Sequence, residues 1–192
     1  IVRGLINKNR RIAISKNHTA AHLMHAAFHN IIGKHALQKG QDVDELKLRF
    51  DFSHFQKVSA DEILAIEKLV NEKIQANISL DEKRNVPMAE AKESGAMMLF
   101  GEKYGESVRI ITFDKDYSVE LCGGTHVSST GEIGLFKIVS ESAIAAGIRR
   151  IEAVCGFEAL KFIQQEMNEL EDIRQIFKGN PSPTKAIHQL QE

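Results

Sequence analysis

Two pairs of metal-ligating side chains, far apart in the sequence, constrain this chain most strongly. His18 and His22 lie four residues apart in a stretch with helical spacing, and Cys122 and His126 lie four apart around a Gly-Gly pair. Residues i and i+4 share one helix face, so the two histidines can grip one ion from one side. The glycines allow a tight turn that would close the other pair on the same ion. Imidazole and thiolate suit zinc, so the pattern predicts a fold that brings both pairs together around Zn²⁺.

The first pair is ambiguous because four histidines fall on one helical stripe. His18, His22, His25 and His29 are spaced by near-whole turns. Such a stripe is about 16 Å long at ~1.5 Å per residue, which is too long for one ion. Spacing alone therefore permits His18 with His22, His22 with His25, or His25 with His29. The alternative without a metal is a helix whose histidines are solvated or satisfied in the core.

Length and composition are typical of a globular domain with an appendage. The chain has 192 residues, of which 43% are hydrophobic and 27% charged. No apolar run approaches the ~20 residues that span a bilayer, so we expect no membrane contact. The two cysteines, Cys122 and Cys155, exclude a disulfide framework. A thiolate ligand needs reducing conditions, which favours a cytoplasmic location, and we expect Cys155 to be a core side chain. Because the chain begins at Ile1 without a signal-peptide pattern, we expect a fragment of something longer.

Charge is unevenly distributed although the net charge is only −1. The segment before Asp42 has no acidic residue and contains the histidine motif. A basic surface beside a metal site suits a phosphodiester ligand, whereas the alternative is a solvated surface offset by acids elsewhere in the fold. This segment holds seven basic residues, Arg3, Lys8, Arg10, Arg11, Lys16, Lys34 and Lys39.

Periodicity predicts an α+β fold, with a largely antiparallel sheet packed with helices and a long C-terminal helical arm. A capping box at Ser59 and Glu62 opens an amphipathic helix that we expect to end near Ile78, and Pro87 is expected to start another. The other predicted helices span residues 16–32 and 157–177. The predicted strands span residues 1–5, 12–14, 46–52, 108–113, 117–121, 135–139 and 148–154.

Five motifs in order resemble the editing domains of alanyl-tRNA synthetases, over about residues 10–156. Threonyl-tRNA synthetase editing domains share the histidine and cysteine pairs, but Arg-Phe-Asp-Phe-Ser-His and Arg-Arg-Ile-Glu favour the alanyl type. The resemblance implies an editing domain over residues 1–156 and a helical linker over 157–192 that begins a coiled-coil arm and could pair with a second copy. The motifs are Asn-His-Thr-Ala-Ala-His-Leu at 17–23, Arg-Phe-Asp-Phe-Ser-His at 49–54, Leu-Phe-Gly-Glu-Lys-Tyr-Gly at 99–105, Glu-Leu-Cys-Gly-Gly-Thr-His at 120–126 and Gly-Ile-Arg-Arg-Ile-Glu at 147–152.

The resemblance also implies which residues form the site. The metal ligands of the family correspond to His18, His22, Cys122 and His126, which leaves His25 and His29 outside the ligand set. A glutamine of the editing pocket corresponds to Gln38, and Gln38 or Thr19 is expected to recognise the substrate. The family usually has a second threonine where this chain has Ala21, so we expect a hydroxyl beside the metal to be missing.

By resemblance, the substrate is the acceptor end of tRNA(Ala) mischarged with serine or glycine, and the reaction is hydrolysis of the aminoacyl ester. Zinc would activate water, which needs an open coordination position, or would orient the substrate. We weigh two alternatives, a zinc-stapled tRNA-binding module without catalysis and a free-standing deacylase of the same superfamily. A zinc hydrolase for another small ester or amide fits the basic segment less well. The cations expected to contact phosphate are Arg10, Arg11, Lys16, Lys103, Arg149 and Arg150.

Overall fold

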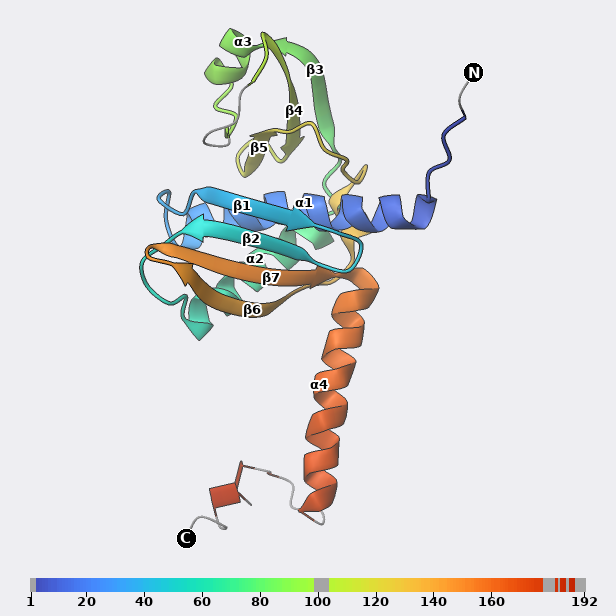
Figure 1. Ribbon diagram of the computed structural model, residues 1–192, viewed down its shortest axis with the longest axis vertical. Coiled ribbons are helices and arrows are strands. Elements are labelled where there is room, and N and C mark those ends of the chain that lie inside the picture. Colours follow the sequence, from blue (N-terminus) through green and yellow to red (C-terminus); the bar gives the residue numbers. More distant parts are fainter. Residues whose placement is uncertain (1–2, 99–103, 178–181, 183, 186, 189–192) are drawn as a thin grey trace.

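The computed structural model describes residues 3–98, 104–177, 182, 184–185 and 187–188. Two antiparallel sheets and four α-helices make an α+β fold, as predicted (Figure 1). The helices are α1 (Lys8–Ile31), α2 (Ala60–Gln75), α3 (Met88–Glu93), α4 (Gly156–Ile176) and a short 3₁₀ turn, η1 (Thr130–Ile133). The strands are β1 (Gln38–Val43), β2 (Leu48–Ser53), β3 (Asp81–Pro87), β4 (Ser107–Phe113), β5 (Ser118–Leu121), β6 (Phe136–Ala145) and β7 (Ile148–Cys155).

Helix α1 is the central element of the fold and is longer than predicted. The side chain of Asn7 accepts a hydrogen bond from the backbone N–H of Arg10, which caps the helix at its first turn. The strand predicted at residues 12–14 is therefore wrong, because this segment belongs to the exposed first half of α1. Residues 3–5 have no regular structure, so the strand predicted at residues 1–5 is also wrong over its described part.

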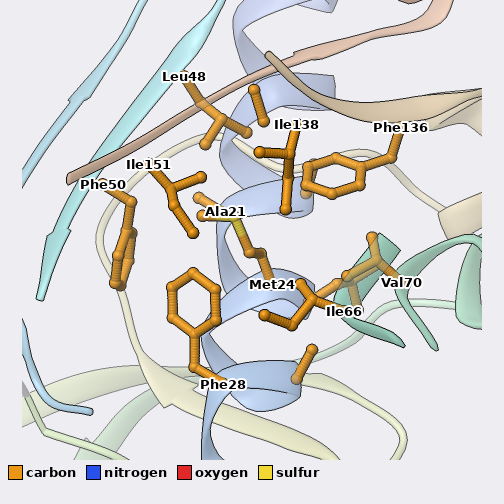
Figure 2. Packing of buried hydrophobic residues seen from close by; sticks show 14 of the residues in the cluster. Ala21, Met24, Phe28, Leu48, Phe50, Ile66, Val70, Phe136, Ile138 and Ile151 are labelled. Carbon is orange, nitrogen blue, oxygen red and sulfur yellow. The ribbon is translucent and has the colours of Figure 1, made fainter. Parts of the chain in front are cut away.

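The larger sheet has the order β1-β2-β7-β6 and covers α1 and α2. Alternation along β2 sends Leu48 and Phe50 into the core, where they meet Met24 and Phe28 of α1 (Figure 2). Helix α2 begins at the predicted capping box and adds its own apolar face to the same core. This packing fixes α1 against the sheet, and the adjacent face of the helix carries the histidines.

The smaller sheet has the order β3-β4-β5 and, with α3, lies beyond the β1 edge of the larger one (Figure 1). The paired strands predicted at residues 108–113 and 117–121 are confirmed as β4 and β5. Strands β1 and β3 were not predicted from the sequence. Both are edge strands with mostly polar or charged residues, so the apolar alternation that marks a strand is missing.

Helix α4 projects from the end of β7 away from both sheets (Figure 1). It confirms the helix predicted at residues 157–177, and only Ala159 among its residues is buried. The division of the chain at residue 156 stays a prediction. In the described parts of the chain, we find no helix with the length and apolar character needed to cross a membrane.

Candidate metal centre

The two sequence pairs meet where α1 passes the C-terminal end of β5. Successive helical turns of α1 present His18 and His22 to the small sheet. Cys122 directly follows β5, and the chain turns back after it to bring His126 alongside. These four residues form the only cluster of at least three histidine, cysteine or acidic side chains within ligating distance that the described residues contain. His25 and His29 lie outside the cluster, so the geometry favours the pairing of His18 with His22.

The separations between ligand atoms suit a tetrahedral ion. Cys122 Sγ lies 3.6 Å from His18 Nε2 and 3.4 Å from His126 Nε2. In a tetrahedral zinc site with Zn–N of about 2.0–2.1 Å and Zn–S of about 2.3 Å, sulfur and nitrogen ligands are roughly 3.5 Å apart. One ligand atom from each of the four residues lies within 4.8 Å of all the others. The residues therefore fit zinc in both chemistry and spacing.

The turn that carries Cys122 is held by Arg109 of β4. The Arg109 guanidinium donates to the carbonyl oxygens of Cys122, at 3.2 Å, and Gly124. Its Nε donates to Glu82 of β3 at 2.7 Å, which orients the guanidinium. The Gly124 N–H in turn points at Cys122 Sγ at 3.4 Å, an arrangement that favours a thiolate. Arg109 thus fixes the sulfur ligand through the backbone.

Two histidines of the cluster have a hydrogen-bond partner on the side away from the ligand atoms, and the third faces a carboxylate there. His126 Nδ1 lies 3.2 Å from Thr19 Oγ, which also accepts the backbone N–H of Val127. His18 makes a hydrogen bond to the backbone of Thr125, and His22 Nδ1 faces Glu120 at 3.5 Å. The Nε2 atoms of His18 and His126 face the sulfur, as metal-binding imidazoles with an occupied Nδ1 would.

Burial keeps these imidazoles neutral. Desolvation is the main cause that lowers the pKa of His126 to about 3, and His18 adds to it by charge repulsion. Burial likewise lowers the pKa of His18 and lowers that of His22 still further, with added repulsion from His126. Neutral imidazole is the form that binds metals, so a metal that binds near neutral pH need not displace an imidazolium proton from these histidines.

A cavity of about 1130 Å³ opens on one side of the cluster. Its walls include His18, Cys122 and the following turn, β1 from its first residue Gln38, and the segment leading into β4. The two sheets therefore meet around this space, with His18 and Cys122 exposed to it. A cavity of this size exceeds the usual 300–1,000 Å³ of small-molecule pockets, so it admits a ligand larger than an amino acid.

Of the two residues predicted to recognise substrate, one lines the cavity and the other is buried behind the cluster. Gln38 lines the cavity, in strand β1. Thr19 is completely buried behind His126 and does not line this cavity, and its contact with substrate stays a prediction. Ala21 is also completely buried, within the apolar core of Figure 2. The missing hydroxyl beside the metal, which the resemblance implies at this position, stays a prediction.

The cations predicted to bind phosphate are scattered. Arg11 lines the cavity, Arg10 is exposed and pairs with Glu45, and Lys16 is partly buried away from the cavity. Lys103 lies outside the described residues.

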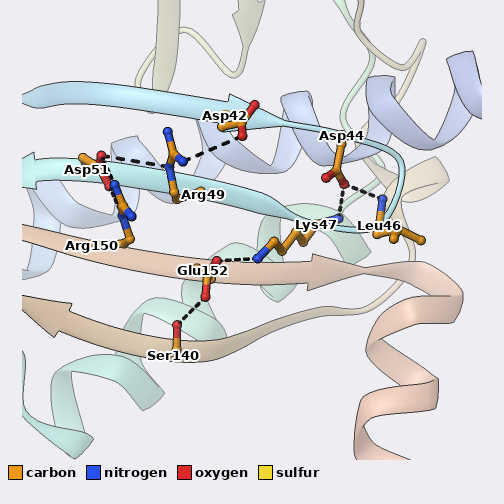
Figure 3. A network of polar contacts seen from close by, with 9 residues as sticks. All are labelled: Asp42, Asp44, Leu46, Lys47, Arg49, Asp51, Ser140, Arg150 and Glu152. Carbon is orange, nitrogen blue, oxygen red and sulfur yellow. Dashed lines mark hydrogen bonds and ion pairs between the residues drawn. The ribbon is translucent and has the colours of Figure 1, made fainter. Parts of the chain in front are cut away.

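Arg149 and Arg150 lie on opposite faces of β7, as strand alternation predicts, and neither belongs to the cluster. Arg150 donates two hydrogen bonds to Asp51, at 2.7 and 2.8 Å, on the outer face of the larger sheet (Figure 3). Arg149 donates two to Glu141, both at 2.6 Å, and its side chain is only 12% exposed. Neither arginine lines the cavity, which argues against the predicted phosphate contacts for these two residues.

Two residues that support the cluster were missed by the sequence reasoning. Arg109 of β4 contacts Glu82 of β3 and the turn after β5, and no local sequence pattern reveals contacts between such distant segments. Glu120 did leave a signal, since it is an acidic residue between apolar neighbours in a strand whose other residues predict burial. It is only 4% exposed and lies on the side of β5 that faces α1.

Comparison with known proteins relates the chain to aminoacyl-tRNA synthetases. Residues 108–152 match the family model described as threonyl and alanyl tRNA synthetase second additional domain. The chain is 54% identical to an alanine–tRNA ligase of Cytophaga hutchinsonii over 97% of its length, and 50% identical to one of Christiangramia forsetii over 99%. An alanine–tRNA ligase of Salinibacter ruber is 48% identical over the whole chain. The chain spans about a fifth of the length of these relatives.

Proposed function

Since the chain is homologous along nearly its whole length to one segment of alanine–tRNA ligases, we propose that it is the editing domain of such a ligase. The reaction is hydrolysis of the ester that joins serine or glycine to tRNA(Ala), with Zn²⁺ as cofactor. The observation that carries the proposal is the position of His18 and Cys122 in the wall of a large cavity. A zinc ion that only stapled the fold would need no such opening.

The chemistry explains why a ligase for alanine needs a second site. Glycine is smaller than alanine by one methyl group, and a pocket that admits alanine discriminates against it by only ~1–3 kcal/mol. Serine adds a hydroxyl, which a small apolar pocket also rejects poorly. Hydrolysis of the wrong ester at a separate site corrects both errors.

The proposed site must spare alanine, and Gln38 is the residue that we assign to this task. A side-chain amide in the cavity wall can pair with the hydroxyl of serine. With alanine bound, that amide would stay unpaired in a desolvated site, at a cost of ~1–3 kcal/mol. This difference favours serine by about tenfold to a hundredfold.

The protein's residues have separate tasks in this proposal. His18, His22, Cys122 and His126 would hold Zn²⁺, which supplies Lewis-acid polarisation of the ester or a lowered water pKa when bound. Thr19 positions His126 through its hydroxyl, and Arg11 offers a cation to phosphate at the cavity wall. A thiolate ligand requires reducing conditions, so we place the protein in the cytoplasm.

A deacylation assay tests the proposal directly. The chain is incubated with tRNA(Ala) charged with serine, glycine or alanine, before and after treatment with a chelator. We expect loss of the serine and glycine esters, slower loss of the alanine ester, and no turnover by Cys122→Ala. Hydrolysis at the full rate by chelated, zinc-free protein would refute the role of zinc. Tight tRNA binding without any turnover would instead identify a binding module stapled by zinc.

A further inference from the structure

Among the described residues, one buried carboxylate has no lysine or arginine beside it. Asp51, Glu67 and Glu120 are the buried acidic residues of the described chain. Asp51 is paired with Arg150, and Glu67 with Lys137 at 2.9 Å. A carboxylate removed from water needs such a partner, because desolvation of an uncompensated charge is costly. Glu120 has no lysine or arginine partner among the described residues.

The groups that face Glu120 are two buried imidazoles of α1. Glu120 Oε2 lies 3.5 Å from His22 Nδ1, and Oε1 lies 3.6 Å from His25 Nδ1. These distances are slightly long for hydrogen bonds, and His22 Nδ1, His25 Nδ1 and Glu120 Oε1 all lack a hydrogen-bond partner. Each imidazole nitrogen therefore faces one oxygen of the same carboxylate and needs only a small shift to pair with it.

This arrangement decides which nitrogen of His22 is left for a metal. With Nδ1 directed at a carboxylate, the proton resides on Nδ1 and the lone pair on Nε2. The Thr19 hydroxyl occupies the same position at His126. A cation on Nε2 would polarise the Nδ1–H toward Glu120, and it would also supply the positive charge that the carboxylate lacks.

We infer that Glu120 is a positioning residue of the metal centre, accepting the Nδ1–H of His22 while His25 braces the carboxylate from the other side. The inference rests on the metal binding proposed above. Glu120 does not line the cavity beside the cluster, so we assign it a role that acts only through His22. Its function is to fix the tautomer and orientation of one ligand and to balance the charge of the ion.

The test compares Glu120→Ala and Glu120→Gln with the unsubstituted chain. Zn²⁺ affinity is measured by competition with a chromophoric chelator, and geometry by the absorption spectrum of the Co²⁺-loaded protein. The alanine variant cannot accept the Nδ1–H, so we expect a 10–100-fold loss of affinity and weakened d–d bands. The glutamine variant retains an acceptor oxygen, so we expect it to recover most of the spectrum and to lose less than about tenfold in affinity.

A matched control separates this role from general destabilisation. Glu67 is equally buried but pairs with Lys137 and the backbone N–H of Ile138, away from the cluster. We expect Glu67→Gln to lower the melting temperature while the Zn²⁺ affinity stays within twofold. Unchanged affinity and Co²⁺ spectrum in Glu120→Ala would overturn the role of Glu120. Failure of the unsubstituted chain to bind either metal would overturn the metal centre itself, whatever the result of the deacylation assay.

Discussion

The ring of His18 leaves no room for a side chain at Gly124, and this offers a sharp test of the metal cluster. A methyl group added at Gly124 would lie 2.5 Å from His18 Nδ1 and closer still to Cε1. Ordinary contact requires about 3.5 Å, so the ring must retreat by about 1 Å. Metal–ligand distances tolerate only about ±0.2 Å. Gly124→Ala should therefore remove His18 from the ligand set.

The expected loss of Zn²⁺ affinity is estimated by dividing the binding free energy of the ion equally among its four ligands. Structural zinc sites contribute about 10–16 kcal/mol in apparent binding free energy, so one ligand accounts for roughly 2.5–4 kcal/mol. That share corresponds to a roughly 100- to 1,000-fold loss of Zn²⁺ affinity. The fold itself should persist, because His18 borders the cavity and its ring has space to move. We expect the metal-free variant to lose no more than about 1 kcal/mol of unfolding free energy.

The neighbouring glycine provides the control. A methyl group at Gly123 would meet nothing within 4 Å, and neither Gly123 nor Gly124 has a positive φ that would disfavour alanine. Gly123→Ala should thus bind Zn²⁺ like the unsubstituted chain. Competition against a chromophoric chelator measures both affinities, and circular dichroism reports the fold. Equal affinity of the two variants would show that His18 is not a ligand in this geometry.

Three further predictions concern the support of the site and the extent of the domain. Arg109→Lys removes the guanidinium that donates to the turn after β5, so chelator competition should show roughly tenfold weaker Zn²⁺ binding. Arg84 is exposed and pairs with the same Glu82, and Arg84→Lys should leave Zn²⁺ binding unchanged. Hydrogen bonds from Arg109, and to a smaller extent from Arg84, lower the pKa of Glu82 from 4.5 to about 2. The stabilisation that the ionised Glu82 gives is therefore complete above pH 4.5 and is lost as the pH falls toward 2. A carbon-detected NMR titration of Glu82 with a midpoint above about 4 would contradict this. A chain ended at residue 162 should keep its Zn²⁺ affinity within about twofold and its melting temperature within about 5 °C, because only Ala159 of α4 is buried; a larger loss in either measurement would extend the domain into the helix.

The sequence predicted those parts of the fold whose signals are local. The capping box at Ser59 is a reciprocal pair of hydrogen bonds within four residues, and α2 begins there as expected. The spacing of the candidate ligands is also a local signal, but it left three histidine pairings open, and the choice of His18 with His22 came from the family resemblance. Residues 12–14 of α1 were instead predicted as a strand, since Ile12 and Ile14 alternate like strand residues, and the Asn7 cap that starts the helix was not predicted.

Other features depend on contacts between distant segments and leave no local pattern. Strand β1 is polar throughout because it forms an edge of the sheet and the wall of the cavity, so Gln38 could be assigned only through the family resemblance. Arg109 is significant because β3 pairs with β4 beside the turn that it holds. The ion pairs of Arg149 and Arg150 likewise require their partners, Glu141 and Asp51, to lie on neighbouring strands.

Helix α1 couples the hydrophobic core to the candidate site because both depend on its orientation. Ala21 and Met24 pack into the core on one face, and His18 and His22, one turn apart, face the small sheet. Any core substitution that rotates the helix by about 20° moves an imidazole nitrogen, some 6–7 Å from the helix axis, by about 2 Å. That shift exceeds the tolerance of metal coordination. We therefore expect a larger residue at position 21 to act on the site through the setting of this helix, so that its effect appears in metal affinity before it appears in the ratio of serine to alanine hydrolysis.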